Sequence, residues 1–396
     1  RFGGGGFFRG ARESRDGMKS VRDIPTLSGT RVLVRAPLNV PLVNGEVAND
    51  FRLRRALPTI EFLANAGAKV IVCGHIGRAP EETLAPVYRA LGALLPQVSF
   101  SSEAVGPVAH AAAEALENGG VLVLENLRRY PGEKGNDPAF ARELASLADV
   151  FVQDAFDTCH REDASIVGVS KLLPSYAGLL LAEEVAALSE ARVPERPALA
   201  IIGGAKFETK EPVLNALLER YDHVFVGGAL ANDFLTAKGY AMGASLVSGA
   251  HEDSLRALLA SDRIVLPSDV VVAASGADAS AGHTRTVDAI GSDEAALDIG
   301  PETAAALATL ARSSATILWN GPLGNYENGF TAGTKALAEA IAASSARSIV
   351  GGGDTVAAIE ALGLADQFSF ISTGGGAMLD FLTRGTLPGI AVLGKS

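Results

Sequence analysis

The chain has 396 residues, of which 48% are hydrophobic and 20% charged, and its formal net charge is −11. This length is too great for one ordinary hydrophobic core, so two domains are expected. The acidic balance argues against non-specific nucleic-acid binding, and no apolar run reaches the roughly 18–20 residues that cross a bilayer. The hydrophobic and charged content suits a globular α/β protein. Two cysteines far apart in the sequence are typical of a reducing compartment, so we expect the protein to be cytoplasmic.

Residues 1–17 differ in composition from the rest of the chain. They contain a run of four glycines, two phenylalanines and scattered arginines, without the apolar core of a signal peptide. Met18 and the residues after it are typical of a natural start. We therefore expect residues 1–17 to be a non-native or disordered extension that takes no part in the fold.

Four apolar runs in the first half of the chain are predicted to be buried strands, at residues 32–35, 70–73, 121–124 and 150–152. Amphipathic stretches lie between them. One of these, residues 57–66, has Pro58 near its start and Gly67 just past its end, as helices often do. Strands that alternate with helices predict a parallel sheet.

Cationic residues follow the ends of these predicted strands, where ligands bind in parallel sheets. They are His75, Arg78, Arg128 and Arg161, and Arg52, which precedes a predicted helix, is expected to join them. One arginine alone is ordinarily a surface or ion-pair residue. Several together in an acidic protein predict a site for a small polyanion such as a phosphorylated acid. No second histidine stands at metal-ligand spacing from His75, so we interpret it as a donor to phosphate or carboxylate.

In the second half, the predicted strands end in glycines instead. The buried run at residues 198–202 leads to Gly203, Gly204 and Lys206, after a proline-containing stretch at residues 191–197 that separates the two halves. Glycine-rich loops follow four more apolar runs, at residues 227–228, 321–324, 351–353 and 374–376. Exposed backbone N–H groups at such turns bind anions, and glycine lets the backbone approach a ligand closely. The recurrence predicts one face that holds polyphosphate and a nucleotide base.

Two acidic residues in this half are candidate ligand-binding groups. Asp354 follows three glycines at a predicted helix start, where it is either an N-cap or a Mg²⁺ ligand, and the two roles are compatible. Glu327 is a candidate acceptor for a ribose hydroxyl, or else an ordinary surface glutamate. The P-loop, protein-kinase and Gly-x-Gly-x-x-Gly signatures are absent, which disfavours those nucleotide-binding classes.

Taken together, these stretches resemble the phosphoglycerate kinase family from Met18 onward. The resemblance rests on an ordered set of motifs, any one of which alone is weak. In the first half they are Leu57-Pro-Thr-Ile60, His75-Ile-Gly-Arg78, Glu125-Asn-Leu-Arg128, Asp154-Ala-Phe-Asp-Thr158 and His160-Arg161. In the second half they are Gly203-Gly-Ala-Lys206, Asp298-Ile-Gly-Pro301, Trp319-Asn-Gly-Pro-Leu-Gly324, Gly351-Gly-Gly-Asp-Thr355 and Ser372-Thr-Gly-Gly-Gly-Ala377.

The resemblance implies a monomer with two lobes, each a Rossmann-like parallel sheet flanked by helices, joined by a hinge helix near residues 179–188. Residues 18–188, completed by about 387–396, would bind phosphoglycerate, and residues 189–386 would bind nucleotide. The implied reaction is the reversible transfer of phosphate between 1,3-bisphosphoglycerate and Mg-ADP, giving 3-phosphoglycerate and Mg-ATP in glycolysis. No nucleic-acid or membrane partner is implied.

The resemblance also implies roles for individual residues of this sequence. The substrate-binding set is Asn39, Arg52, His75, Ile76, Gly77, Arg78, Arg128 and Arg161. The nucleotide-binding set is Lys206, Lys210, Gly228, Leu297, Asn320, Pro322, Glu327, Gly352, Gly353, Asp354 and Thr355. Arg52 and Lys206 would be catalytic, Asp354 would bind Mg²⁺, and a backbone loop at Gly374, Gly375 and Gly376 would contact the transition state.

The chemistry is consistent with this implied reaction. A carboxylate nucleophile is already ionised at neutral pH, so no general base is needed. Transfer then depends on alignment, charge neutralisation and exclusion of water. Lys206 and Arg52 would hold the transferring group from opposite lobes, which requires the lobes to close.

Six positions depart from the family pattern, and we expect them to affect how tightly the ligands bind. The most important is Pro37, which stands where the family usually has an aspartate; the others are Thr209, Arg129, Asp157, Ala229 and Asn325. Two alternatives remain: a non-catalytic relative that binds nucleotide, and a kinase for a different phosphorylated acid. Retention of Lys206, Arg52 and Asp354 disfavours the first of them.

Overall fold

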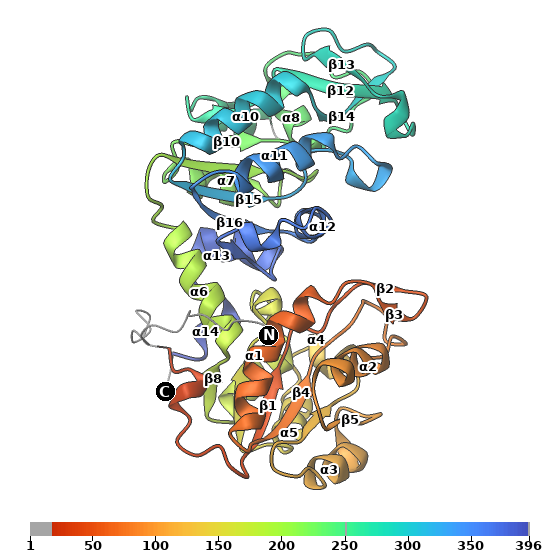
Figure 1. Ribbon diagram of the computed structural model, residues 1–396, viewed down its shortest axis with the longest axis vertical. Coiled ribbons are helices and arrows are strands. Elements are labelled where there is room, and N and C mark those ends of the chain that lie inside the picture. Colours follow the sequence, from red (N-terminus) through yellow and green to blue (C-terminus); the bar gives the residue numbers. More distant parts are fainter. Residues whose placement is uncertain (1–17, 250–251, 395–396) are drawn as a thin grey trace, which may run out of the picture. The chain divides into compact units, whose positions relative to one another are not determined.

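The computed structural model describes residues 18–249 and 252–394, so the expectation for residues 1–17 lies outside the described residues. Contacts divide the chain into two compact units (Figure 1). The first unit runs to Ala186 and is completed by the chain from Pro388 on. The second unit runs from Ala187 to Leu387.

The first unit is built on a six-stranded parallel sheet with the strand order β5-β6-β4-β1-β7-β8, which confirms the predicted fold class. A two-stranded antiparallel hairpin, β2 and β3, was not predicted. The strands are β1 (Arg31–Arg35), β2 (Leu42–Val43), β3 (Glu46–Val47), β4 (Lys69–Cys73), β5 (Val98–Phe100), β6 (Val121–Val123), β7 (Val150–Gln153) and β8 (Ser175–Ala177).

The helices of the first unit connect these strands. They are α1 (Phe51–Asn65), α2 (Ala85–Leu94), α3 (Gly106–Glu114), α4 (Pro131–Lys134), α5 (Pro138–Ala145) and α14 (Pro388–Ala391). The short helical turns are η1 (Val21–Asp23), η2 (Leu127–Arg129), η3 (Phe156–Thr158), η4 (Ala164–Gly168) and η5 (Val169–Lys171). The prediction that the first helix begins near Pro58 was wrong, because α1 begins at Phe51 and contains that proline. Arg52 therefore lies within the first turn of α1 and does not precede it.

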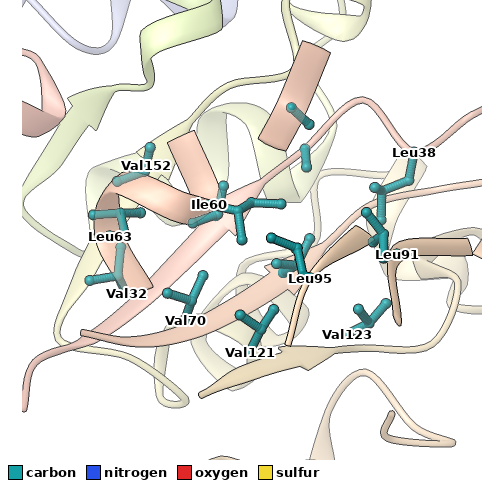
Figure 2. Packing of buried hydrophobic residues seen from close by; sticks show 14 of the residues in the cluster. Val32, Leu38, Ile60, Leu63, Val70, Leu91, Leu95, Val121, Val123 and Val152 are labelled. Atoms are coloured by element: carbon teal, nitrogen blue, oxygen red, sulfur yellow. The ribbon is translucent and has the colours of Figure 1, made fainter. Parts of the chain in front are cut away.

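Successive side chains of a strand point to opposite faces of the sheet, so the apolar strands of the first unit form two cores, one on each face. Figure 2 shows Val32 and Val70 of neighbouring strands beside Leu63 and Ile60 of α1, with Val121 of the next strand beside Leu95 in the same cluster. The alternate residues of the strands form a second cluster with α3 and α5: Leu33, Ile71, Leu122 and Phe151. Because both faces are covered, the sheet presents its strand ends to ligands.

Helix α6 (Leu179–Ala191) carries the chain from the first unit into the second. Its first turn is held by the first unit, since the Leu181 N–H donates to Asp154 Oδ1 at 3.1 Å and the Leu179 N–H donates to Thr59 Oγ1 at 2.9 Å. Burial raises the pKa of Asp154 to about 7, and a hydrogen bond from Thr59 opposes that rise. The residue that follows strand β7 therefore anchors the connecting helix.

The second unit is built on another six-stranded parallel sheet, with the order β11-β10-β9-β15-β16-β17. The chain moves outward from β9 to β11 and then restarts at β15 on the other side of β9. The point of reversal, between β9 and β15, is where ligands bind in such sheets. The strands are β9 (Ala198–Ile202), β10 (His223–Val226), β11 (Ile264–Val265), β15 (Thr316–Asn320), β16 (Arg347–Gly351) and β17 (Phe370–Ile371).

A separate antiparallel sheet of the second unit, with the order β13-β12-β14, was not predicted from the sequence. Its strands are β12 (Asp269–Ala274), β13 (His283–Thr286) and β14 (Glu294–Ile299). The helices of this unit are α7 (Glu211–Leu218), α8 (Ala229–Ala237), α9 (Glu252–Leu259), α10 (Pro301–Ser313), α11 (Ala332–Ala342), α12 (Gly353–Ala361) and α13 (Gly376–Arg384). The short turns are η6 (Ala279–Ala281), η7 (Tyr326–Asn328) and η8 (Ala365–Gln367). Within the described part of the chain, every helix is too short or too polar to cross a membrane.

Candidate functional site

Cationic side chains converge on His75 in the loop after β4. This imidazole is only 3% exposed, and its burial lowers the pKa far below the ordinary value. Four guanidinium charges lower it further: Arg35, Arg128, Arg161 and Arg52. They come from β1, η2, the loop after η3 and α1, so separate elements bring their charges to one place. His75 is therefore a neutral ring inside a strongly cationic region.

Arg128 carries a donor that the folded chain leaves unused. Its Nε is buried and has no hydrogen-bond acceptor among the described residues. Burial and the neighbouring charge of Arg161 lower the pKa of Arg128, so the two cations are close and repel each other. A buried donor without an acceptor costs free energy, and the repulsion between the two adjacent cations adds to that cost. An anionic ligand placed between them relieves both costs.

Arg52 lies at the edge of the same group of cations. Its Nη1 donates to the Asn39 carbonyl oxygen at 2.5 Å and lies 4.0 Å from Asp157 Oδ2. The Asn39 side chain accepts a hydrogen bond from the Gly77 N–H at 2.9 Å, which ties the loop after β1 to the loop after β4. Asp157 is thus an acidic side chain beside the predicted catalytic arginine.

Asn126, after β6, shapes the loop that carries Ile76 and Gly77. Its Oδ1 accepts from the Ile76 N–H at 3.2 Å, and its Nδ2 donates to the Ile76 carbonyl oxygen at 3.0 Å. Gly77 has φ +62° and an added Cβ would collide with Glu82, so this position requires glycine. Arg78 follows in an exposed turn, where its N–H donates to Glu82 Oε2 at 2.5 Å. The structure therefore places Arg78 on the exposed rim of the loop.

The glycines after β9, β10 and β15 have a structural role that was not predicted. An added Cβ at Gly203 would lie 2.1 Å from the Pro322 carbonyl oxygen, and one at Gly321 would lie 2.6 Å from Gly203 backbone atoms. At Gly228, which has φ +64°, an added Cβ would lie 2.9 Å from the Gly204 backbone. Contact between the loop backbones therefore requires these glycines, in addition to any approach by a ligand.

Helix N-termini without side-chain caps lie beyond three of the strands in the second sheet. The N-cap residues of α8, α12 and α13 are Gly228, Gly352 and Gly375, and none offers a capping side chain. At Gly353 and Gly376, the first residues of α12 and α13, an added Cβ would meet nothing within 4 Å. The Gly374 N–H instead donates to Ser372 Oγ at 3.1 Å. Uncapped N–H groups and the helix dipole make such ends suitable for phosphate.

A cavity of about 390 Å³ in the second unit is lined by residues at the N-termini of α8 and α12. Five of the predicted nucleotide-binding residues line it: Gly228, Leu297, Pro322, Glu327 and Asp354. Asp298 also lines it and accepts the Gly333 N–H at 3.0 Å; burial raises the pKa of Asp298 to about 6. One wall is apolar and includes Leu246, Val270 and Leu323. The cavity therefore combines an apolar wall with helix N-termini, as a nucleotide requires.

Four other predicted residues lie around the ends of β15 and β16: Lys210, Asn320, Gly352 and Thr355. Lys210 Nζ donates to Asn320 Oδ1 at 3.1 Å, and burial lowers the pKa of Lys210 to about 8. Thr355 Oγ1 accepts the Gly321 N–H at 3.1 Å, so its hydroxyl holds a loop in place. An added Cβ at Gly352 would lie 3.4 Å from the same N–H nitrogen. These contacts connect the end of β15 and the loop after it to Lys210 before α7 and to the start of α12.

Lys206 lies in an exposed loop, and the helix predicted directly after it begins only at Glu211. Phe207, the next residue, is 2% exposed and packs edge-on against Phe234 with ring centroids 5.9 Å apart. The buried phenylalanine anchors the loop while the lysine remains exposed. Lys206 is thus an exposed cation next to the glycines that follow β9.

Asp354 lies at the second position of α12, and Gly352 is the N-cap, so the N-cap interpretation of Asp354 was wrong. Its exposed carboxylate lines the cavity. In the described part of the chain, no cluster of three or more His, Cys, Asp or Glu is arranged to hold a metal. One carboxylate beside a phosphate site fits Mg²⁺, which takes one or two carboxylates together with phosphate oxygens and water.

Sequence reasoning missed Arg35, which ends β1 and is fully buried. Its Nη2 donates to His75 Nδ1 at 3.0 Å. The signal available in the sequence was a charged residue at the end of an apolar run. Among the departures from the family pattern, Arg129 bonds Glu125 Oε2 at 3.0 Å, and Pro37 is buried in the loop after β1.

Known proteins resemble this chain over nearly its whole length. The family model described as phosphoglycerate kinase matches residues 21–384. The phosphoglycerate kinase of Desulforudis audaxviator is 47% identical over 388 residues, covering 95% of this chain and 98% of that protein. The one from Moorella thermoacetica is 48% identical over 380 residues, covering 93% and 97%.

Solved structures show the same relationship. The phosphoglycerate kinase of Pyrococcus horikoshii superimposes with a TM-score of 0.87 at 31% identity. That of Coxiella burnetii superimposes with a TM-score of 0.81 at 40% identity. Each comparison covers 95% of this chain and 98% of the solved one. The chain belongs to the phosphoglycerate kinase family.

Proposed function

We propose that the two units divide the substrates of one phosphotransferase reaction between them. The reaction is the reversible transfer of phosphate between 1,3-bisphosphoglycerate and ADP, which gives 3-phosphoglycerate and ATP, a step of glycolysis. The first unit binds the phosphoglycerate and the second unit binds the nucleotide. This division is our proposal.

The observation that carries the proposal is the group of arginines around neutral His75, which includes the unused buried donor of Arg128. Phosphoglycerate bears a phosphate and a carboxylate, so it offers anionic acceptors at both ends. Arg128 and Arg161 would bind these acceptors, and the mutual repulsion of the two cations favours such a ligand. Asn39 holds the loop after β4 in place through the Gly77 N–H.

The cavity of the second unit supports the nucleotide half of the proposal. Its apolar wall would take the base, Glu327 would accept from a ribose hydroxyl, and the uncapped ends of α12 and α13 would bind phosphates. The nucleotide substrate would arrive with Mg²⁺, held on the protein side by the Asp354 carboxylate. The metal would neutralise charge on the phosphate oxygens.

The chemical step requires little beyond positioning and charge. The attacking carboxylate of 3-phosphoglycerate is already ionised, so the chain needs no general base. Lys206, exposed on its loop, and Arg52, at the start of α1, would neutralise charge that builds up on the transferring phosphoryl group. Because we assign the two substrates to different units, we expect transfer to require the units to close by bending at α6. We further propose that the enzyme acts as a cytoplasmic monomer, without nucleic-acid or membrane partners.

The test compares Lys206→Ala with the matched control Lys238→Ala, which removes another exposed lysine of the same unit. Lys206→Ala should lower kcat by at least about 100- to 1,000-fold, because it removes charge stabilisation in the transition state. Its affinity for ADP should change only modestly, and the control should behave as the parent does. Near-normal kcat in Lys206→Ala would remove this lysine from the mechanism. If the parent protein turns over only a different phosphorylated acid, the assignment of 3-phosphoglycerate as the substrate is wrong.

A further inference from the structure

The hydrogen bond between Arg35 and His75 fixes the position of a proton. Arg35 Nη2 lies 3.0 Å from His75 Nδ1, and both side chains are buried. A guanidinium is only a donor and stays charged in proteins, so the imidazole nitrogen must accept. Nδ1 therefore carries no proton, and the neutral ring holds its proton on Nε2.

Two further hydrogen bonds hold the Arg35 guanidinium in place. Its Nε donates to Ser165 Oγ at 2.9 Å, and its Nη1 donates to the Ala36 carbonyl oxygen at 2.8 Å. Ser165 is held in turn by Glu133 of α4: its hydroxyl donates to Oε1 at 2.5 Å and its N–H to Oε2 at 3.0 Å. Arg35, Ser165 and Glu133 are all fully buried. The guanidinium therefore has one orientation, and that orientation is aimed at the His75 ring.

The charges facing His75 act in the same direction as this hydrogen bond. Arg35 of β1, Arg52 of α1, Arg128 of η2 and Arg161 of the loop after η3 all disfavour the imidazolium form, as does burial. A cationic ring at this place would have to coexist with four guanidinium groups. A neutral ring still offers one N–H donor without adding to that repulsion.

We propose that Arg35 is a positioning residue for phosphoglycerate binding: it locks His75 as the neutral Nε2–H tautomer, so that the ring donates to an anionic oxygen of the substrate. The acceptor is a phosphate or carboxylate oxygen, and the inference rests on the proposed function of the first unit. The consequence is that the hydrogen bond from His75 does not change between about pH 5 and pH 8. An exposed histidine away from other charges titrates near pH 6.5 and would change within that range.

The first test observes the unmodified, substrate-free protein, so it does not depend on turnover. ¹⁵N-labelled histidine is observed by NMR, and the His75 signals are assigned with His75→Gln. Nδ1 should show the unprotonated shift and Nε2 the protonated shift, with no titration between about pH 5 and pH 8. A protonated Nδ1, or a ring that titrates in this range, would overturn the proposal even if the enzyme is fully active.

The second test compares Arg35→Met with the control Arg31→Met, which removes the partly exposed, Asp149-paired arginine at the start of the same strand. In the parent and the control, KM for 3-phosphoglycerate should follow only the titration of the substrate between pH 6 and pH 8. In Arg35→Met, burial and the three remaining guanidinium groups still disfavour the imidazolium, so the ring stays neutral, but nothing holds its Nδ1 as the acceptor. The ¹⁵N signals of this variant should therefore show a larger share of the Nδ1–H tautomer, and KM for 3-phosphoglycerate should rise by about 2- to 12-fold with little change in kcat. An unchanged tautomer together with an unchanged KM would overturn the positioning role. Arg35→Met/Glu133→Gln removes both buried charges and replaces the single variant if that does not fold.

Discussion

Replacing Gly203 with alanine tests whether contact between backbones builds the nucleotide cavity. The new Cβ would lie 2.1 Å from the Pro322 carbonyl oxygen and 2.7 Å from that of Gly321, whereas ordinary contacts begin at 3.4 Å. Neither obstacle is a flexible side chain. The loops after β9 and β15 must therefore move apart by about 1 Å, which disturbs the cavity wall that Pro322 provides.

The cost follows from the size of this clash. Overpacking of this kind costs about 1–3 kcal/mol, and in a domain of this size each kcal/mol lowers Tm by about 2–4 °C. We therefore expect a fall in Tm of about 2–12 °C for the second unit, and ADP affinity should fall as well. The matched control is Gly353→Ala, where the new Cβ meets nothing within 4 Å, and its stability should not fall.

Trp319 supplies the assay. It is the single tryptophan of the sequence and is fully buried in β15, so its fluorescence follows unfolding of the second unit. Urea titrations monitored at this residue give the free energy of unfolding, and calorimetry gives the Kd for ADP. If Gly203→Ala unfolds like Gly353→Ala and binds ADP as the parent does, backbone contact does not account for this glycine.

Three further predictions concern single residues. Burial lowers the pKa of Lys210 to about 8, and bound phosphate should raise it, so ADP binding at pH 8 should take up part of a proton. Calorimetry in buffers of different ionisation enthalpy should find this uptake in the parent and none in Lys210→Arg, which stays charged. Burial raises the pKa of Asp154 to about 7 from its ordinary 3.8, so between these values the folded state binds a proton that the unfolded state does not. The free energy of unfolding should therefore fall as the pH rises from about 4 to 7, by up to about 4 kcal/mol. Urea unfolding of Asp154→Asn should lack this part of the decline, and equal pH dependence in both proteins would contradict the assignment. Pro37 has no side-chain acceptor for the substrate hydroxyl, so Pro37→Asp should increase discrimination against 2-deoxy-3-phosphoglycerate by about 2- to 12-fold in kcat/KM; an unchanged ratio would show that position 37 does not contact the hydroxyl.

The two parallel sheets were predictable because their strands are short apolar runs rich in β-branched residues. β13 could not be found in this way, since each of its residues is exposed and it has no apolar alternation. The start of α1 was misplaced because proline is common in a first helical turn, whereas Pro58 lies in the interior. Periodicity shows that a helix exists, but in this chain it did not show where that helix begins.

The candidate site was only partly predictable, for a similar reason. The arginines around His75 were found because each follows a predicted strand or precedes a helix. Arg35 was missed because its partners Ser165 and Glu133 are distant in sequence and only the fold brings them together. The glycine loops were found, but sequence alone does not show which backbone atoms lie opposite Gly203.

Transfer of phosphate between ATP and 3-phosphoglycerate can be observed by ³¹P NMR of the purified protein with ATP, Mg²⁺ and 3-phosphoglycerate, with each component omitted in turn. ADP and an acyl phosphate signal should appear only when all three are present. Tight ATP binding without turnover, or release of inorganic phosphate without an acyl phosphate, would contradict the proposed transfer.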